Sequence, residues 1–149
     1  MRKMYWDAGI AARAQQYANT RPTWHDGNRG PFGENLYWKW EMGPTSHDSH
    51  GPKAILMWGN EFKDLGMKSI NTGNGVGAIG HATQMAWANS FKLGCGISNW
   101  QDGRMIKTCI VCRYGGPGNY PHQFMYKAGA PASQCPAGTR PERQSGLCA

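Results

Sequence analysis

The chain has 149 residues and a formal net charge of +7 at pH 7, and hydrophobic residues make up 40% of it. This length suits one domain with its own buried core and gives no reason to expect a second one. The charged fraction of 17%, together with 21 glycines and 9 prolines, argues against a disordered chain and predicts a loop-rich globular domain. No apolar run is long enough to span a membrane, and no hydrophobic core of an export signal follows Met1.

The positive charge favours anionic partners such as sulfated polysaccharides, phospholipid headgroups or acidic proteins. Lys and Arg are scattered along the chain without forming a block, which is typical of a solubilising surface. The Trp-Lys-Trp triplet at 38–40 interleaves aromatic and basic residues, but one triplet is weak support for base stacking. We therefore expect no nucleic-acid partner and keep an anionic glycan or a membrane surface as open alternatives.

The first predicted element is a helix that begins at about Asp7. Asp7 suits the N-cap, because its carboxylate can accept hydrogen bonds from the first turn. Apolar residues then recur at helical spacing, at Ile10, Ala11, Ala14, Tyr17 and Ala18. The polar stretch 20–31 predicts a loop that would bring His25 toward the motif GENLYW at 33–38.

A second irregular stretch is predicted at 43–51. Its His-Asp-Ser-His run at 47–50 does not match the HExxH metal motif, so we interpret the run as an exposed loop. Pro52 then opens a predicted helix that contains Glu61 and ends at Gly66. The apolar face of this helix is predicted at Ile55, Trp58, Phe62 and Leu65.

Residues 68–78 are rich in glycine and predict a loop, and 81–88 suits a short helix. The first residue of this helix is His81. A histidine beside a helix start is more often structural than functional, so its role depends on the motifs that accompany it.

Two apolar runs at 93–98 and 105–113 flank an Asp-Gly pair, which predicts a β-hairpin. A two-residue Asp-Gly loop would place Cys95 opposite Ile110, between two other cysteines. This strand pairing alone does not decide which cysteine is the disulfide partner of Cys95.

The sequence of the tail at 128–149 predicts a loop.

The cysteine content indicates an oxidising compartment. The chain contains Cys95, Cys109, Cys112, Cys135 and Cys148. The CxxC at 109–112 lies in a β-like run, without the second pair of a structural zinc site or the helix start of a redox motif. Disulfides are the better account. The odd count leaves one thiol unpaired or available to another chain.

Four segments follow the order of the motifs of one protein family. They are MYWDAGIAARAQQYAN, GENLYW at 33–38, GHATQMAW followed by KLGCG at 80–96, and CRYGGPGNY at 112–120. Together they resemble the CAP superfamily, which comprises cysteine-rich secretory proteins, antigen 5 and pathogenesis-related 1 proteins. The resemblance runs from about Met4 to Tyr120.

The resemblance implies an α+β fold, an α-β-α sandwich in which a small, mostly antiparallel sheet lies between helical layers. Residues 1–127 would form the CAP domain, with the first helix of the family missing ahead of the Trp-Asp pair at 6–7. Residues 128–149 are similar to the short cysteine-containing extension of helminth secreted members.

The resemblance also implies a disulfide between Cys95 and Cys112. Elimination then pairs Cys135 with Cys148. Cys109 is left as the free thiol, either buried in a strand or forming a bridge to another chain.

The resemblance further implies a central cleft that holds two histidines and two glutamates, His25, Glu34, Glu61 and His81. Two neutral imidazoles can bind a divalent ion such as zinc, and the carboxylates can complete its shell or hold a water molecule. Two neighbouring carboxylates would also shift each other's pKa, which makes Glu34 and Glu61 candidates for an acid or base. We assign no catalytic residue, and we expect that zinc is not required for folding.

The function implied by the resemblance is that of a secreted protein that acts by binding and not as an enzyme. Its expected partners are a lipid or sterol, or a host extracellular protein in helminth immune modulation, and a homodimer stays open. The alternative is a zinc-dependent hydrolase in which His25 and His81 hold the metal and Glu34 or Glu61 acts as general base.

Overall fold

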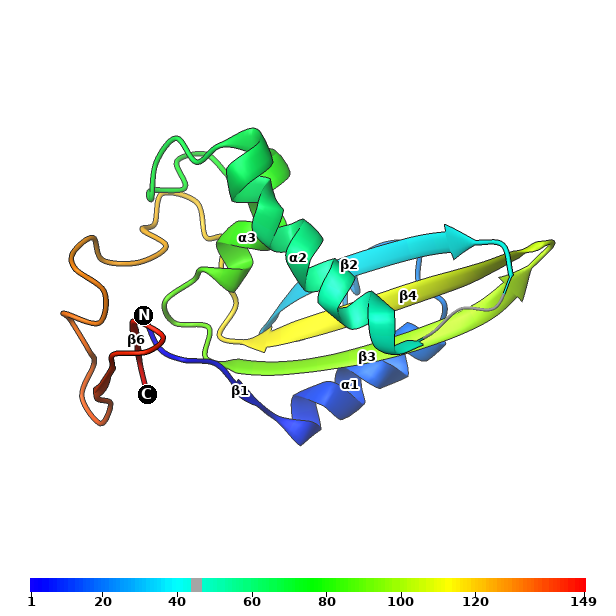
Figure 1. Ribbon diagram of the computed structural model, residues 1–149, viewed down its shortest axis with the longest axis horizontal. Coiled ribbons are helices and arrows are strands. Elements are labelled where there is room, and N and C mark those ends of the chain that lie inside the picture. Colours follow the sequence, from blue (N-terminus) through cyan, green and yellow to red (C-terminus); the bar gives the residue numbers. More distant parts are fainter. Residues whose placement is uncertain (44–46) are drawn as a thin grey trace.

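A four-stranded sheet between two layers of helices forms the centre of the protein in the computed structural model, which describes residues 1–43 and 47–149 (Figure 1). The larger elements are α1 (Ala8–Asn19), β2 (Phe32–Glu41), α2 (His47–Leu65), α3 (Gly80–Met85), β3 (Lys92–Asp102) and β4 (Met105–Gly115). The short elements are β1 (Tyr5–Trp6), the 3-10 helix η1 (Gly77–Ile79), β5 (Pro141–Glu142) and β6 (Leu147–Cys148).

The sheet has the strand order β1-β3-β4-β2. Its β1–β3 pair is parallel, and the β3–β4 and β4–β2 pairs are antiparallel. Helix α1 covers one face, and α2 and α3 cover the other (Figure 1). The predicted α-β-α sandwich with a mostly antiparallel sheet is therefore confirmed.

Helix α1 begins where the sequence predicts. Asp7 has an extended backbone and accepts a hydrogen bond from the Ile10 N–H at 3.0 Å, which makes it the N-cap. The helix buries Ile10, Ala14 and Ala18. Ala14 and Ala18 pack with Leu36 of β2 and with Cys109 and Val111 of β4. Because alanine side chains are small, α1 lies close to the sheet.

Helix α2 begins earlier than predicted, at His47 and not at Pro52. The predicted irregular stretch 43–51 is thus helical from 47 onward, and its residues 44–46 lie outside the described residues. The interpretation of the histidine run as an exposed loop is wrong for His50, which is 1% exposed. Its Nε2 lies 3.2 Å from Glu41 Oε2, and this contact with β2 anchors the additional turn ahead of the proline.

The buried face of α2 also differs from the predicted one. Ala54 and Trp58 are buried, whereas Ile55 and Leu65 are 49% and 57% exposed. The Trp58 indole N–H donates to the Leu36 carbonyl at 3.2 Å, and this bond sets which side of the helix faces the sheet. No helix in the described part of the chain is both long and apolar enough to cross a membrane.

The β3–β4 hairpin forms as predicted, but its register is shifted by two residues. Asp102 pairs with Met105, so the loop is Gly103-Arg104. Gly103 has a φ of 60° and occupies the first loop position, where type II′ turns favour glycine. Cys95 therefore lies opposite Cys112 and not opposite Ile110, and the two are joined by a disulfide.

The tail is more ordered than the predicted loop. A disulfide joins Cys135 to Cys148, and β5 and β6 form a small antiparallel pair. The Cys148 N–H donates to the Met1 carbonyl at 2.9 Å, and the Lys3 N–H donates to the Cys148 carbonyl at 2.8 Å. These bonds hold the two ends of the chain side by side (Figure 1).

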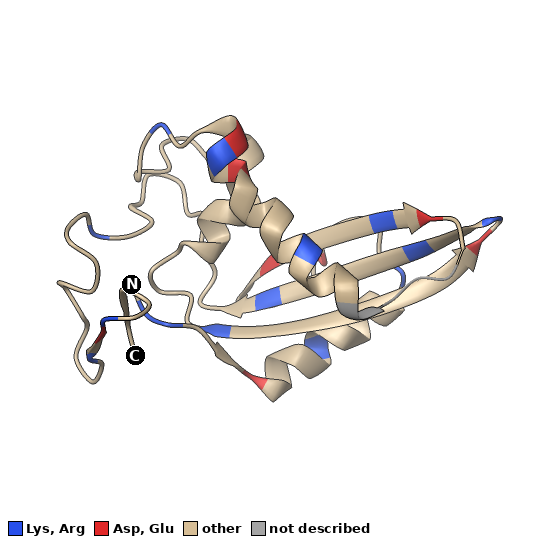
Figure 2. Cartoon of the chain, viewed as in Figure 1, with Lys and Arg blue, Asp and Glu red and all other residues tan. Residues whose placement is uncertain are grey.

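The positive charge is spread over several elements. Lys and Arg occur on α1, α2, three strands and the tail, interrupted by acidic residues (Figure 2). This distribution agrees with the absence of a basic block in the sequence.

Candidate functional site

Two His–Glu pairs lie at the edge of the sheet formed by β2. His25 Nδ1 lies 2.9 Å from Glu34 Oε1, and His81 Nδ1 lies 2.5 Å from Glu61 Oε1. In the structure, each of the two candidate histidines thus contacts one of the two candidate glutamates.

The first pair is embedded in a network of charged groups. The Glu34 side chain is fully buried, and its Oε1 also accepts from the Asp26 N–H at 3.0 Å. Its Oε2 accepts from Arg113 Nε at 3.1 Å, and Arg113 Nη2 donates to Asp26 Oδ2 at 2.5 Å. Burial alone would raise the pKa of Glu34, but the hydrogen bonds from His25, Asp26 and Arg113 lower it below its usual value. Glu34 is therefore a stabilised carboxylate.

The second pair joins α2 to α3. Glu61 Oε2 accepts from the His81 N–H at 3.1 Å and from the Ala82 N–H at 2.9 Å. These backbone N–H groups lie in the first turn of α3, where the helix itself offers them no acceptor. The His81 ring stacks on Trp58, with ring centroids 5.8 Å apart. These contacts fix both the backbone and the ring of His81.

Glu34 and Asn35 are consecutive residues of β2, the edge strand. Consecutive strand residues point to opposite faces. Glu34 points to the face of α1, whereas Asn35 points to the face of α3 and donates to the His81 carbonyl at 3.1 Å. Within residues 1–43 and 47–149, no group of three or more His, Cys, Asp or Glu side chains is placed to hold a metal ion. The contacts among the four candidates are thus those of two His–Glu pairs.

The exposed groups of the site are its imidazoles. The side chains of His25 and His81 are 40% and 37% exposed, whereas those of Glu34 and Glu61 are 0% and 15% exposed. With Nδ1 bonded to a carboxylate, Nε2 is the nitrogen that remains for a ligand. Each glutamate already accepts hydrogen bonds at both oxygens. The arrangement thus suits a ligand that binds imidazole nitrogen, with the carboxylates orienting the rings.

Several residues of the motifs were not singled out by sequence reasoning, and they turn out to hold α3 in place. Asn119, with a φ of 61°, donates to the Gly80 carbonyl at 2.8 Å and accepts from the Thr83 hydroxyl at 2.7 Å. Gln84 Oε1 accepts from the Gly118 N–H at 2.8 Å. The CRYGGPGNY segment at 112–120 therefore positions α3, the helix that carries His81.

Arg113 was also missed. An arginine directly after the apolar run 109–112 was the available signal, because a buried cation requires an anionic partner.

Cys109 is the free thiol of the described chain and is fully buried in β4. Burial, aided by the nearby Glu34 carboxylate, raises the pKa of this thiol to about 12. A bridge to another chain would require β4 to open, so the structure favours the buried thiol of the two alternatives.

We expect Glu34→Gln to reduce the dependence of stability on acid pH. The folded-state pKa of Glu34 lies below its usual value of 4.5, so its contribution is complete above about pH 4.5 and is lost as the pH falls toward the folded-state pKa. The difference in free energy of unfolding between wild type and variant should therefore shrink below about pH 4.5. Urea unfolding between neutral pH and about pH 3 measures it, and a constant difference over that range would contradict the prediction.

Comparisons with known proteins agree with this architecture. The family model described as "CAP: Cysteine-rich secretory protein family" matches residues 1–114. Scoloptoxin SSD976 of Scolopendra dehaani is 35% identical over 99% of this chain and 70% of that protein. Ancylostoma secreted protein of Ancylostoma caninum is 35% identical over 99% of this chain, which spans only 36% of that protein.

Two solved structures are similar over the whole chain. Na-ASP-1 has a TM-score of 0.88 and 33% identity, and the match covers 100% of this chain and 38% of that one. The structure described as NaASP2 with Zn2+ has a TM-score of 0.82 and 27% identity, covering 100% of this chain and 77% of that one. The chain therefore belongs to the CAP family of cysteine-rich secretory proteins.

Proposed function

We propose that this chain is a secreted CAP protein that acts by binding an extracellular ligand and not by hydrolysing one. The observation that supports this proposal is the state of the two glutamates. Each carboxylate already accepts hydrogen bonds at both oxygens from neighbouring groups of the protein. A hydrolase that used this site would need one of them as a general base, within reach of a water molecule.

Neither glutamate suits that role in this arrangement. The Glu34 side chain is fully buried, and its lowered pKa makes it a weak base. Glu61 holds the start of α3 through two backbone N–H groups, so a proton transfer at Glu61 would disturb the helix. The site thus favours binding over the alternative of a zinc-dependent hydrolase.

Secretion and a binding role have separate support. The two disulfides suit an oxidising compartment. Among the relatives, the Ancylostoma protein is described as secreted, and Venom allergen 5 of Vespula pensylvanica is 33% identical over 85% of this chain. Partners of the proposed kind are a lipid or sterol, or an extracellular protein of a host. Trp24 and Trp40, which are 75% and 50% exposed, offer large apolar surfaces for such a partner.

We also propose that a divalent ion such as zinc binds at the Nε2 atoms of His25 and His81. The residues present fit such an ion in part, because both rings are oriented through Nδ1 and remain exposed at the other nitrogen. Glu34 and Glu61 would act as orienting partners of the rings. When bound, such an ion would supply a Lewis acid that polarises a ligand oxygen.

Zinc titration of the metal-free protein tests this site. We expect His25→Ala and His81→Ala each to weaken zinc binding by about tenfold or more, because each removes one nitrogen ligand. His122→Ala is the matched control, since His122 is an exposed loop residue outside both pairs. Isothermal titration calorimetry gives the affinities, and circular dichroism checks that the variants fold. Equal zinc binding in all variants would overturn the metal proposal.

Two further assays test the binding function itself. Saturable binding of sterols, fatty acids or host extracellular proteins is the expected outcome, and its absence across lipids, glycans and host proteins would overturn the proposal. Peptide and ester hydrolysis that disappears with a chelator and with His81→Ala would establish the hydrolase instead.

A further inference from the structure

We propose that the outer edge of β2 pairs two copies of this chain, so that their sheets join into one. β2 is the last strand in the order β1-β3-β4-β2 and forms one edge of the sheet (Figure 1). The pairing surface is the segment 38–42, which comprises the end of β2 with its Trp-Lys-Trp triplet and the residue after the strand. This segment contains no residue of the two His–Glu pairs, so the inference goes beyond the proposed binding function.

Side-chain bonds to β3 show which backbone groups of β2 point to the outer edge. Gln15 bonds with both the N–H and the C=O of Ile97, so Ile97 directs these groups away from β4. In an antiparallel ladder the opposite residue, Ile110, then directs its own groups to Tyr37 of β2. The residues on either side of Tyr37 therefore direct their N–H and C=O to the outer edge, and this alternates along the strand.

The contact between β2 and α2 agrees with this direction. The Leu36 carbonyl points outward, where it accepts from the Trp58 indole N–H. In the part of the chain that the structure describes, no loop, turn or side-chain hydrogen bond engages the backbone of Trp38 or Trp40. Lys39 and Trp40 are exposed, whereas the middle of the strand is buried. The end of β2 thus presents outward N–H and C=O groups on which another strand can be added.

The charges at the end of β2 indicate the partner and its register. Lys39 and Glu41 flank Trp40, and a basic position followed by an acidic one marks the end of the strand (Figure 2). An antiparallel second copy presents these charges in the reverse order and is therefore complementary. When Trp40 lies opposite Trp40 of the second copy, each Lys39 lies directly opposite a Glu41. Opposite charges at such positions stabilise a sheet.

Two neighbouring registers are less favourable. Placing Trp38 opposite Trp40 would set Lys39 against Lys39 of the second copy, and like charges directly opposite each other are destabilising. Placing Trp38 opposite Trp38 would require the backbone of Leu36, whose carbonyl is already bonded to Trp58. The register centred on Trp40 is therefore the one that both the charges and the outward backbone groups favour.

The same register brings apolar groups together on the face of the sheet that α1 covers. Trp38, Trp40 and Trp100 are among the residues that line a hollow of about 160 Å³. Met42 directly follows β2 and is 77% exposed, and the register places it opposite Trp38 of the second copy. The flexible side chain of methionine can fill such a hollow. Each copy thus offers both the hollow and the group that fills it, as a two-fold interface requires.

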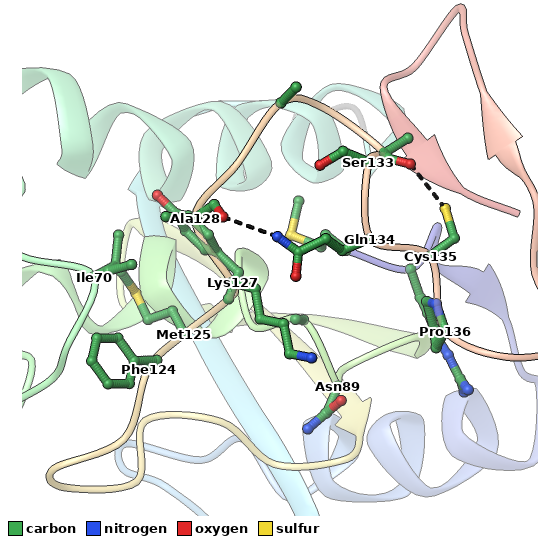
Figure 3. A pocket seen from close by; sticks show the side chains of 16 residues that line it. Ile70, Asn89, Phe124, Met125, Lys127, Ala128, Ser133, Gln134, Cys135 and Pro136 are labelled. Atoms are coloured by element: carbon green, nitrogen blue, oxygen red, sulfur yellow. Dashed lines mark hydrogen bonds between the residues drawn. The ribbon is translucent and has the colours of Figure 1, made fainter.

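This surface is separate from the cavity at the ends of the chain. That cavity has a volume of about 850 Å³ and is lined mainly by the first residues, the segment 124–128 and the tail at 130–136 (Figure 3). Among its described lining residues, none belongs to 38–42. Pairing through β2 would cover Trp40 but would leave this cavity and Trp24 to ligands.

Sedimentation equilibrium of the full chain tests the association. The surface is small, so we expect a reversible monomer–dimer equilibrium with a Kd of about 10–100 μM. About 0.15 M salt limits the repulsion between two chains of net charge +7, because charges are then screened beyond about 8 Å. A chain that stays monomeric up to about 1 mM would overturn the inference.

Charge reversal tests the register. Lys39→Glu and Glu41→Lys should each weaken self-association by about tenfold or more, because symmetry repeats each repulsive pair. An equimolar mixture of the two variants should associate about as tightly as the wild type, because each new charge then faces one of opposite sign. Lys68→Glu, in an exposed loop outside β2, is the matched control and should change nothing. Unchanged dimers in both variants, or a mixture that does not associate, would overturn the inference.

A second measurement avoids Glu41, whose contact with His50 the variant removes. Hydrogen exchange of the wild type should show the Trp38 and Trp40 amides gaining protection as the concentration rises through the Kd. The Tyr37 amide, which bonds to β4, should be protected at every concentration. Protection of the Trp38 and Trp40 amides that does not depend on concentration would overturn the inference.

A proline variant tests the backbone pairing itself. Trp40→Pro removes an N–H that points outward, and proline is tolerated at such positions of edge strands. This variant should fold, as circular dichroism can check, and stay monomeric. Trp40→Phe keeps both the N–H and an aromatic ring and should still dimerise. Dimers of wild-type affinity in Trp40→Pro would show that the copies associate through another surface.

Discussion

Replacing Arg113 with methionine should lower the free energy of unfolding by about 3–5 kcal/mol, the cost of breaking a buried ion pair. The Arg113 side chain is 5% exposed and lies between the carboxylates of Glu34 and Asp26. Methionine keeps an unbranched side chain but has no N–H donors, so the fully buried Glu34 carboxylate would lose its cationic partner. Denaturant unfolding with the disulfides intact measures the loss.

Two further variants make this prediction specific. Arg104→Met removes the same charge at the exposed hairpin loop and should change stability by no more than about 0.5 kcal/mol. Combining Arg113→Met with Glu34→Gln should recover part of the loss, because a neutral amide is less costly to bury without a cation than a carboxylate. A loss for Arg113→Met as small as that for Arg104→Met would show that the network does not contribute to stability.

The ion pair between Arg113 and Glu34 is a feature that the sequence did not predict. Glu34 and Arg113 are direct cross-strand neighbours in β2 and β4, and both lie within motifs that were identified from the sequence. Their pairing could not be predicted, because no sequence spacing indicated that these two strands are adjacent or which residues share a face. The four site candidates were accessible through motifs, whereas the partners that orient them depend on tertiary structure.

The same limit explains the errors in α2 and in the hairpin. Helical spacing identified the apolar residues of α2, but Trp58 and its bond to β2 decide which of them are buried. Turn chemistry predicted the hairpin, but the position of glycine within the loop sets the register, and that position decides the partner of Cys95. Elements with strong local signals, such as α1 with its Asp7 cap, were predicted correctly.

The second large effect concerns the glycines of the KLGCG motif. Gly94 and Gly96 lie on the side of β3 that faces α1, and Cys95 between them points to the other side. A Cβ on Gly96 would lie 2.3 Å from the Gln15 Cα, and one on Gly94 would lie 2.2 Å from the Ala11 N. These are backbone atoms, which cannot rotate away as a side chain can.

We therefore expect Gly96→Ala to lower the free energy of unfolding by about 3 kcal/mol, the upper end of the usual cost of overpacking. The substitution would push α1 off the sheet, and the two hydrogen bonds of the Gln15 amide with the Ile97 backbone, at 2.7 and 2.9 Å, would be strained. Denaturant unfolding gives the magnitude, and hydrogen exchange of α1 amides should show where the structure loosens.

Gly59→Ala is the matched control for this substitution. Gly59 lies within α2, and an added Cβ would meet no atom of another element within 4 Å, so alanine should stabilise the helix by about 0.5–1 kcal/mol. If Gly96→Ala lowers the free energy of unfolding while Gly59→Ala raises it, the loss cannot come from replacing glycine as such. It would then come from the close contact of β3 with α1, which leaves no room for a Cβ at Gly96. If Gly96→Ala were as stable as the wild type, α1 could not pack as closely on β3 as the structure shows.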